Sequence, residues 1–414
     1  MTSKNRPTTQ SFLNPANLGR QLLVATCCAV LLAFPMGAQE STDLSNGDVF
    51  TAQAGPKKHQ KRQSRPVKMG TSAGNVNDFV IGDQFITCCS GTAGALIEKK
   101  GRTFILSNNH VFAQTNSAAA GDPINQPGML DNSCQAPEGD YIATLESFRR
   151  LKFGSGKNKV DVALAEAIEG MVDPTGEILE IGIPGDSTVN PTLGLAVQKA
   201  GRTTGLRRGT ITVTNLNVFV EYTDSCSADA NVLVAEFKNQ FIVQSNGNKS
   251  FSAGGDSGSV IYEDTEECPR AAGLLFAGND VSTVGSKMKT VLKQVKRLSP
   301  KGKATLVGCS AASNGMTFEE QNGVAEIDER EMRLAKRIQA RTEDALFELG
   351  GVRGVGIGRS QEDAERPVMR VFIDRDRPEL KSVIPESIDG LGVEVVESAP
   401  FRALNCLKAP VAGS

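Results

Sequence analysis

The sequence has no tryptophan, three tyrosines and only two histidines in 414 residues. So few histidines disfavour a metal site built on imidazoles, and Cys-x-x-Cys spacing is absent as well. The glycine spacings that hold dinucleotides or phosphates are also missing; Gly351, Gly354, Gly356 and Gly358 do not follow them. We therefore expect neither a metal nor a cofactor.

A strong charge of either sign is lacking too. The formal net charge is −2, and it becomes −5 without residues 1–38, which carry three basic residues and no acid. This segment has an apolar run from Leu22 to Phe34, too short to span a bilayer, and then Met36-Gly-Ala38. It predicts a secretory signal cleaved after Ala38, with an uncleaved interfacial anchor as the alternative. We expect an exported protein, periplasmic or secreted, that meets the membrane only through this signal and binds no nucleic acid.

One stretch, Phe251-Ser-Ala-Gly-Gly-Asp-Ser-Gly-Ser-Val260, is suited to present a serine hydroxyl from a tight turn. Gly255 and Gly258 remove the Cβ atoms that would block a substrate backbone. The N–H groups of Gly255 and Ser257 would then point at one spot and form an oxyanion hole, as acyl transfer requires. Such a serine needs a base.

The two histidines are the candidates for that base. His59 lies in the basic stretch 57–62, where a solvated linker residue is the expected interpretation. His110 follows a strand-like apolar run, and Asp161 interrupts the apolar stretch 160–165 as if embedded in a strand. A buried carboxylate needs a partner, and an aspartate that orients an imidazole has one. The sequence thus predicts a triad of His110, Asp161 and Ser257.

The order His, Asp, Ser along the chain is that of chymotrypsin. The segments 106–111, 159–164 and 255–259 resemble the triad motifs of trypsin/chymotrypsin-like serine peptidases. Three further stretches are similar to a bacterial subgroup related to the plant narrow-leaf-type proteases: Cys88-Cys-Ser-Gly-Thr92, Gln198-Lys-Ala-Gly-Arg-Thr-Thr-Gly205 and Gly273-Leu-Leu-Phe-Ala-Gly278. The resemblance covers roughly residues 70 to 295.

The resemblance implies a mainly β, chymotrypsin-like fold of two six-stranded barrels, with the active site between them. The first barrel would supply His110 and Asp161, and the second Ser257. Animal relatives activate by inserting a new Ile/Val-rich terminus, but the stretch 69–75 lacks that pattern, so we do not expect Asp256 to receive a new amine.

The resemblance also places the substrate pocket. Phe251, six residues before the nucleophile, would lie at its base, and Ala277, Gly278 and Asn279 would form its wall. No acid stands at these positions, so we expect an apolar or small substrate side chain there rather than Lys or Arg. The expected substrate is a protein or peptide.

Composition divides the chain into five parts. Residues 1–38 are the signal, 39–69 a disordered basic linker or propeptide, 70–300 the peptidase domain, 301–325 a linker and 326–414 a small α+β module. Strands are expected at 93–98, 102–107, 208–222, 232–243 and 259–262, a closing helix at 286–297 and the tether at 310–315. In the last module we expect a helix at 326–349, strands at 352–357, 368–373 and 391–396, and a turn or short helix at 378–387. Its expected role is structural or regulatory.

Seven cysteines remain after the signal: Cys88, Cys89, Cys134, Cys226, Cys268, Cys309 and Cys406. In an exported protein some should pair, and an odd count leaves at least one unpaired within a monomer. The pairing and the oligomeric state stay open. Besides a serine endopeptidase, two functions remain possible: an esterase with the same triad, and a catalytically idle binding or scaffold protein. An α/β-hydrolase is excluded, because no histidine follows Ser257.

Overall fold

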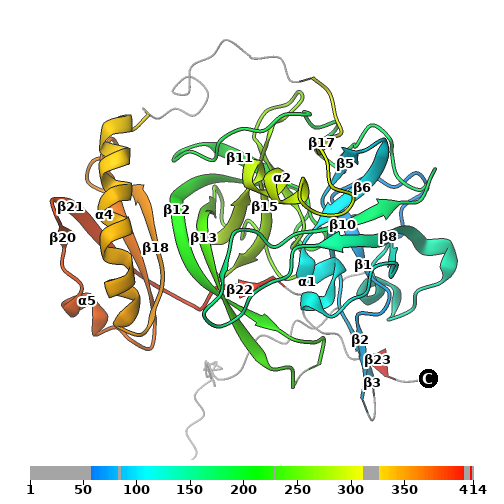
Figure 1. Ribbon diagram of the computed structural model, residues 1–414, viewed down its shortest axis with the longest axis horizontal. Coiled ribbons are helices and arrows are strands. Elements are labelled where there is room, and N and C mark those ends of the chain that lie inside the picture. The colour runs from blue at the N-terminus through cyan, green and yellow to red at the C-terminus, as the bar shows by residue number, and fades with distance from the viewer. Residues whose placement is uncertain (1–56, 83–84, 228, 311–325, 405–410, 413–414) are drawn as a thin grey trace, which may run out of the picture. The chain divides into compact units, whose positions relative to one another are not determined.

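The computed structural model describes residues 57–82, 85–227, 229–310, 326–404 and 411–412. The expected signal segment, residues 39–56 and most of the expected tether lie outside these ranges. The described chain is mainly β, with two sheets that each close on themselves and an α+β module beside the second (Figure 1). This confirms the expected fold class. In the described ranges, no helix has the length and apolar character needed to cross a membrane.

The first sheet forms a six-stranded barrel if β4 and β5, joined through Gly94, are counted as one strand. Its strands pair in the circular order β1 (Thr71–Asn75), β4 (Gly91–Ala93) with β5 (Ala95–Lys99), β6 (Arg102–Ser107), β10 (Ala163–Ala167), β8 (Tyr141–Phe148), β7 (Pro123–Asn125) and back to β1. Alternating apolar residues of these strands, among them Leu96, Phe104 and Leu106, fill the interior. The 3₁₀ turns Gln114–Asn116, Met129–Asn132 and Glu138–Asp140 lie in its loops.

The second sheet also closes. Its order is β12 (Arg207–Thr223), β11 (Ala196–Lys199), β14 (Val260–Glu263), β15 (Ala271–Gly278), β16 (Thr283–Lys287) and β13 (Val232–Ser245), and β13 pairs with β12 again. The long hairpin β12–β13 follows the predicted strands closely. Helix α2 (Met288–Val295) comes next and buries Met288, Val291 and Val295 against the first barrel's core. The short strand β9 (Lys157–Asn158) pairs with β13.

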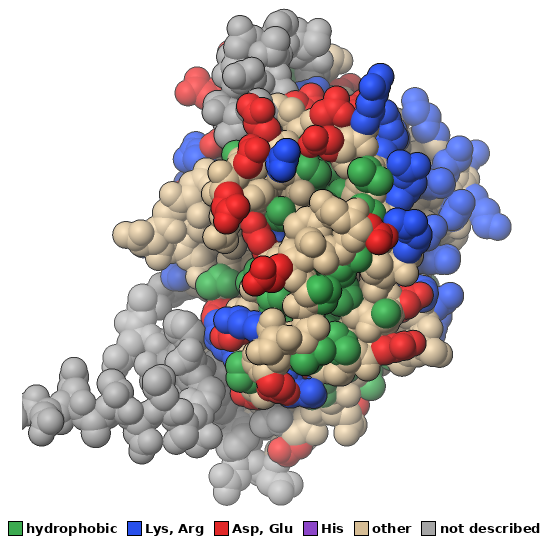
Figure 2. Space-filling model, turned by 90° about the vertical axis from the view of Figure 1, so that its left-hand side faces the viewer, with side chains coloured by type: hydrophobic (Ala, Val, Ile, Leu, Met, Phe, Trp, Pro, Cys, Tyr) green, Lys and Arg blue, Asp and Glu red, His purple; other side chains and the backbone are tan. Residues whose placement is uncertain are grey.

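The C-terminal module extends the second barrel's sheet. Strand β18 (Val352–Arg359) pairs with β12, and then come β19 (Pro367–Asp374), β21 (Leu391–Ser398) and β20 (Ser387–Ile388), with α5 (Leu380–Val383) between β19 and β20. Helix α4 (Glu329–Glu348) begins at Asp328, whose side chain accepts the N–H groups of Arg330 and Glu331, and buries Ala335 and Ile338 in the module's own core. The outer face of this module mixes acidic, basic and hydrophobic side chains (Figure 2).

Two expected linkers are in part ordered pieces of the first barrel. Within residues 57–69, Val67 and Met69 are buried in its core. His59, expected to be solvated, is 3% exposed; its ring contacts Gly70 O (2.7 Å) and Glu180 Oε2 (2.6 Å). At the other end, β17 (Thr305–Leu306) pairs with β5. The prediction of linkers was wrong for these residues because the residues they pack against or pair with are distant in the chain.

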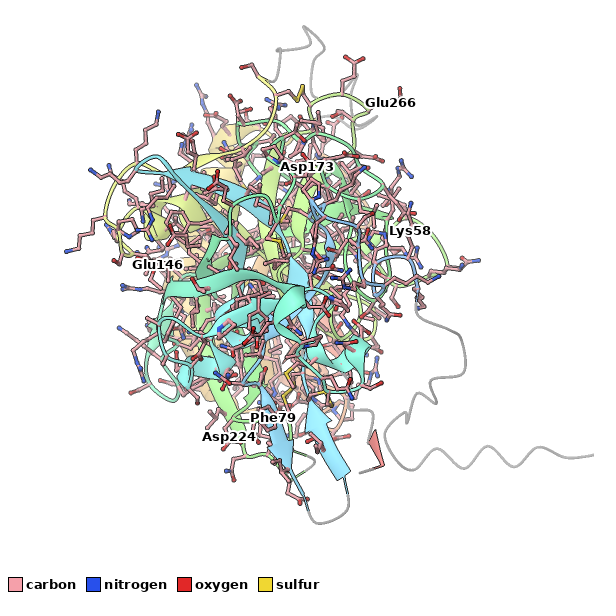
Figure 3. All side chains as sticks on the ribbon, turned by 90° about the vertical axis from the view of Figure 1, so that its right-hand side faces the viewer. Lys58, Phe79, Glu146, Asp173, Asp224 and Glu266 are labelled. Atoms are coloured by element: carbon pink, nitrogen blue, oxygen red, sulfur yellow. A yellow bond between two sulfur atoms is a disulfide. The ribbon has the colours of Figure 1, made fainter. Side chains whose placement is uncertain are left out.

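Three disulfides join Cys88 to Cys134, Cys89 to Cys226 and Cys268 to Cys309, while Cys406 lies outside the described residues. The second bridge ties the end of β3 (Phe85–Cys88), which pairs with β2 (Phe79–Ile81), to the β12–β13 turn. Figure 3 shows this end of the molecule, with Phe79 and Asp224 labelled.

Candidate active site

His110 and Asp161 lie together at the mouth of the first barrel. His110 is in the short helix α1 (Asn109–Phe112) that follows β6, and Asp161 stands just before β10, not inside a strand as expected. The Nδ1 atom of His110 is 2.5 Å from Asp161 Oδ2. The other carboxylate oxygen accepts the N–H of Asn109 at 2.6 Å. Both side chains are almost wholly buried, so the pair is held in one orientation.

A tyrosine that the sequence did not single out completes this group. Tyr222, near the end of β12, donates its hydroxyl to Asp161 Oδ2 at 3.0 Å. Its ring meets that of His110 edge-on, with 5.7 Å between centroids. Burial, and then the negative charge of Asp161, raises the pKa of Tyr222 well above its usual value, so the hydroxyl stays a donor. Only the long-range fold brings it here, and no local motif marks it.

Ser257 lies on the second barrel, where the two barrels touch. Gly255 and Gly258 have φ of +92° and +94°, which explains why glycine is needed at both positions. A Cβ on Gly91 would lie 2.6 Å from Val111, the neighbour of His110, and 3.0 Å from Ser257 O. The fold therefore brings the three predicted residues to one interface.

Ser257 and His110 do not hydrogen-bond each other in this structure. The hydroxyl of Ser257 donates to Phe276 O at 3.2 Å. The Nε2 atom of His110 is buried and has no hydrogen-bond partner among the described residues. The pair of His110 and Asp161 is formed, and one nitrogen of the imidazole is left to act on a proton.

The aspartate next to Ser257 has a cation from its own chain. Lys199 Nζ lies 3.0 Å from Asp256 Oδ2, and both side chains are fully buried. Burial opposes the charge of Asp256, but the Lys199 ammonium and the hydrogen bonds of Thr204 and Ala253 hold its pKa below the usual value. Asp256 thus receives its ammonium partner from Lys199, a residue of the same barrel.

The stretch 198–205, noted for its resemblance, is the cradle of that aspartate. The backbone N–H groups of Thr203 and Thr204 donate to Asp256 Oδ1 at 2.8 and 3.1 Å. Thr203 Oγ1 donates to Gly254 O at 2.5 Å, directly on the serine turn. These bonds fix the backbone around Gly255, and so they set the direction of its N–H group.

A segment of the same chain lies along the predicted substrate wall. Strand β22 (Arg402–Ala403) pairs antiparallel with β15, with Ala403 opposite Ala277 and Arg402 opposite Gly278. Asn279 Nδ2 donates to Ala399 O at 3.2 Å, so all three predicted wall residues face this segment.

The segment also reaches the predicted oxyanion donor. The Gly255 N–H donates to Leu404 O at 2.8 Å, and the Leu404 N–H donates to Phe276 O at 3.2 Å. Phe251, the predicted pocket base, is 3% exposed within an apolar cluster against which Leu404 packs.

A second group of side chains has the spacing of metal ligands. Asp78 Oδ1 lies 3.0 Å from Cys226 Sγ, and Cys89 Sγ completes the group. Both sulfurs belong to one disulfide and so offer no thiolate to an ion. Burial raises the pKa of Asp78 to about 7. This group has no part in the candidate active site.

Residues 150–299 match the family described as the Nal1 C-terminal domain. No curated protein matches the chain by sequence. Three solved structures are similar to it, each over little more than half of this chain. A glutamic-acid-specific serine protease is 18% identical over 58% of this chain and 100% of its own, with a TM-score of 0.37. Protease A of Thermobifida fusca is 15% identical over 57% of this chain and 98% of its own, with a TM-score of 0.33. Nocardiopsis protease is 15% identical over 53% of this chain and 93% of its own, with a TM-score of 0.34. By its own strand pairing the chain has a chymotrypsin-like fold of two closed barrels, to which an α+β module is added.

Proposed function

We propose that the protein is a serine endopeptidase acting through His110, Asp161 and Ser257. The observation that carries the proposal is the orientation of His110: Nδ1 is held by Asp161, and the buried Nε2 has no partner among the described residues. An imidazole held in this way is set up as a general base for a nearby hydroxyl.

In the proposed reaction, the hydroxyl of Ser257 turns from Phe276 O to His110 Nε2 and attacks the substrate carbonyl. The imidazole takes the proton, and Asp161 with the Tyr222 hydroxyl holds the ring in place. The N–H groups of Gly255 and Ser257 stabilise the oxyanion; losing one such donor costs about 3 kcal/mol of barrier in known enzymes. His110 then protonates the leaving amine, and water releases the acyl group.

A peptide is favoured over a simple ester as substrate. Strand β15 pairs with a stretch of peptide backbone through residues 276–278, and this is how an extended peptide adds to a sheet. The three disulfides support the export that residues 1–38 predict, because disulfides persist in oxidising compartments. The narrow-leaf-type subgroup remains part of this proposal, supported by the match over residues 150–299.

Labelling with a fluorophosphonate probe tests the activated serine. Wild type should react, while Ser257→Ala and His110→Ala should not. A Leu404→Asp variant should react faster than wild type, because the chain's own segment then leaves the cleft more easily. If neither wild type nor Leu404→Asp reacts while both are folded by circular dichroism, the protein is the idle scaffold. Amide and ester substrates with the same acyl group then separate a peptidase from an esterase.

A further inference from the structure

The segment from Phe401 to Leu404 lies between β12 and β15, beside the serine turn, as a bound peptide would. It is antiparallel to β15, and its Leu404 N–H donates to Phe276 O, the same oxygen that accepts the Ser257 hydroxyl. On its other side, the N–H of Glu221 on β12 donates to Phe401 O at 2.9 Å. The segment thus fills the gap between two strands of the second barrel and satisfies the backbone groups that a substrate would use.

The carbonyl of Leu404 is the group placed for reaction. Its oxygen accepts the N–H of Gly255 at 2.8 Å, two residues before Ser257 in the serine turn. Gly255 was expected from the sequence as an oxyanion donor, and that donor is now aimed at a peptide carbonyl of this chain. A carbonyl held by such a donor beside an activated serine is the one that the serine attacks.

The Leu404 side chain shows which substrate side chain the site accepts. It packs against the apolar cluster that contains Phe251, and its Cδ1 lies 3.5 Å from where a Cβ on Gly278 would be. The Leu404 side chain therefore lies in van der Waals range of position 278 and of the cluster that contains Phe251, as a substrate side chain in this pocket would.

The chain is held on both sides of the bond that follows Leu404. On the amino side, Phe401 is fully buried and meets Phe372 of the C-terminal module edge-on at 5.5 Å. On the carboxyl side, β23 (Val411–Ala412) pairs with β3 of the first barrel, opposite Ile86 and Phe85. The described residues on both sides of this bond, 401–404 and 411–412, are therefore each paired with strands of the protein.

We propose that the protein's first substrate is its own chain: it cleaves the bond between Leu404 and Asn405, and leucine is the residue it prefers before the cut bond. This rests on the proposed peptidase function. Ser257 Oγ bonds to the Leu404 carbonyl carbon, the bond to the Asn405 nitrogen breaks, and His110 passes the serine proton to that nitrogen. Water then adds to the carbonyl carbon, returns a proton to Ser257 through His110, and leaves Leu404 with a free carboxyl group.

The test is the intact mass of the full-length chain carrying one substitution at a time. Wild type should lose residues 405–414, leaving a chain that ends at Leu404. Ser257→Ala should keep them, and Leu404→Asp should keep them too because a charged side chain does not fit the apolar cluster. The matched variant Leu404→Met should still be cut, since methionine has a similar volume and shape.

Fluorophosphonate labelling of the same four proteins separates this inference from the proposed function. If Leu404→Asp reacts with the probe while wild type stays intact, the serine is active and the self-cleavage inference is wrong; the segment is then a blocking strand. If wild type is cut at another bond, the assignment of leucine is wrong. If neither protein is cut nor labelled, both proposals fail. Loss of residues 405–414 from Ser257→Ala would show that another protease makes the cut.

Discussion

Tyr222 donates its hydroxyl to the same oxygen of Asp161 that faces His110. One carboxylate oxygen of Asp161 therefore contacts the polar atoms of two buried rings, while the second oxygen accepts the backbone N–H of Asn109. The orientation of the imidazole depends on helix α1, which carries His110, and on strand β12, which carries Tyr222, and so on the contact between the two barrels.

Tyr222→Phe should lower kcat/KM by about tenfold or more, because hydrogen bonds to charged groups contribute about 1.5–3 kcal/mol. The loss should fall on kcat, with KM nearly unchanged, since the hydroxyl does not face the substrate strand. Tyr262→Phe is the control: its hydroxyl is buried with no partner among the described residues. Equal effects of the two changes would show that Tyr222 only fills space.

Lys199→Met should destabilise the protein by about 3–5 kcal/mol, because it leaves the buried charge of Asp256 without its cation. Urea unfolding measures this, and fluorophosphonate labelling should fall as the serine turn loosens. Arg208→Met breaks the exposed pair with Asp264 and should change little. A Lys199 variant as stable as the Arg208 variant would mean that Asp256 is held by the threonine bonds alone.

Asp78 predicts a loss of stability as the pH rises from the acidic range to about 7. Burial raises the folded-state pKa of Asp78 to about 7, above its unfolded value. The folded protein then holds the proton of Asp78 more tightly than the unfolded chain does. The stability that this proton contributes is complete below the unfolded pKa of about 4, falls as the pH rises toward 7, and changes no further above the folded pKa. Wild type should therefore lose stability between about pH 4 and pH 7 relative to Asp78→Asn, and the difference between the two proteins should then stay constant.

The check for Asp78 is the urea midpoint of both proteins across that range, without reductant. Asp229→Asn, at an exposed site, should run parallel to wild type. Parallel curves for wild type and Asp78→Asn would show that Asp78 stays charged when buried.

Phe251→Leu should widen the base of the substrate pocket. We compare kcat/KM for peptides that have phenylalanine before the cut bond with kcat/KM for peptides that have leucine there. This ratio should rise about tenfold in the variant, because small changes in pocket volume alter specificity by about that much. Phe241→Leu is the matched control, since Phe241 belongs to the same apolar cluster but faces Gly273 and Gly285. An equal rise of this ratio in both variants would show that Phe251 does not form the base of the pocket.

Local pattern predicted most strands, the helices α2 and α4, and the residues His110, Asp161 and Ser257. These features depend on neighbours in the chain: apolar alternation in strands, apolar periodicity in helices, and a glycine-flanked serine. The pairing of Lys199 with Asp256, the position of Tyr222 and the burial of His59 depend on residues far apart in sequence. A lysine or tyrosine in a strand has the same local signature whether it faces water or a buried carboxylate.

The path of residues 401–404 was also beyond local pattern. The stretch is short, and its partners β12 and β15 lie well over a hundred residues earlier in the chain. The expected wall residues lie beside it, but nothing in their sequence indicates what they contact.

The groups that hold the carboxylate of Asp256 in the described chain all belong to residues 199–253: the Lys199 ammonium, the Thr203 and Thr204 donors and the Ala253 N–H. None of them comes from residues 401–404. The turn that carries Ser257 is therefore built independently of the segment that lies against it, and a chain that has lost that segment keeps the same support for its serine.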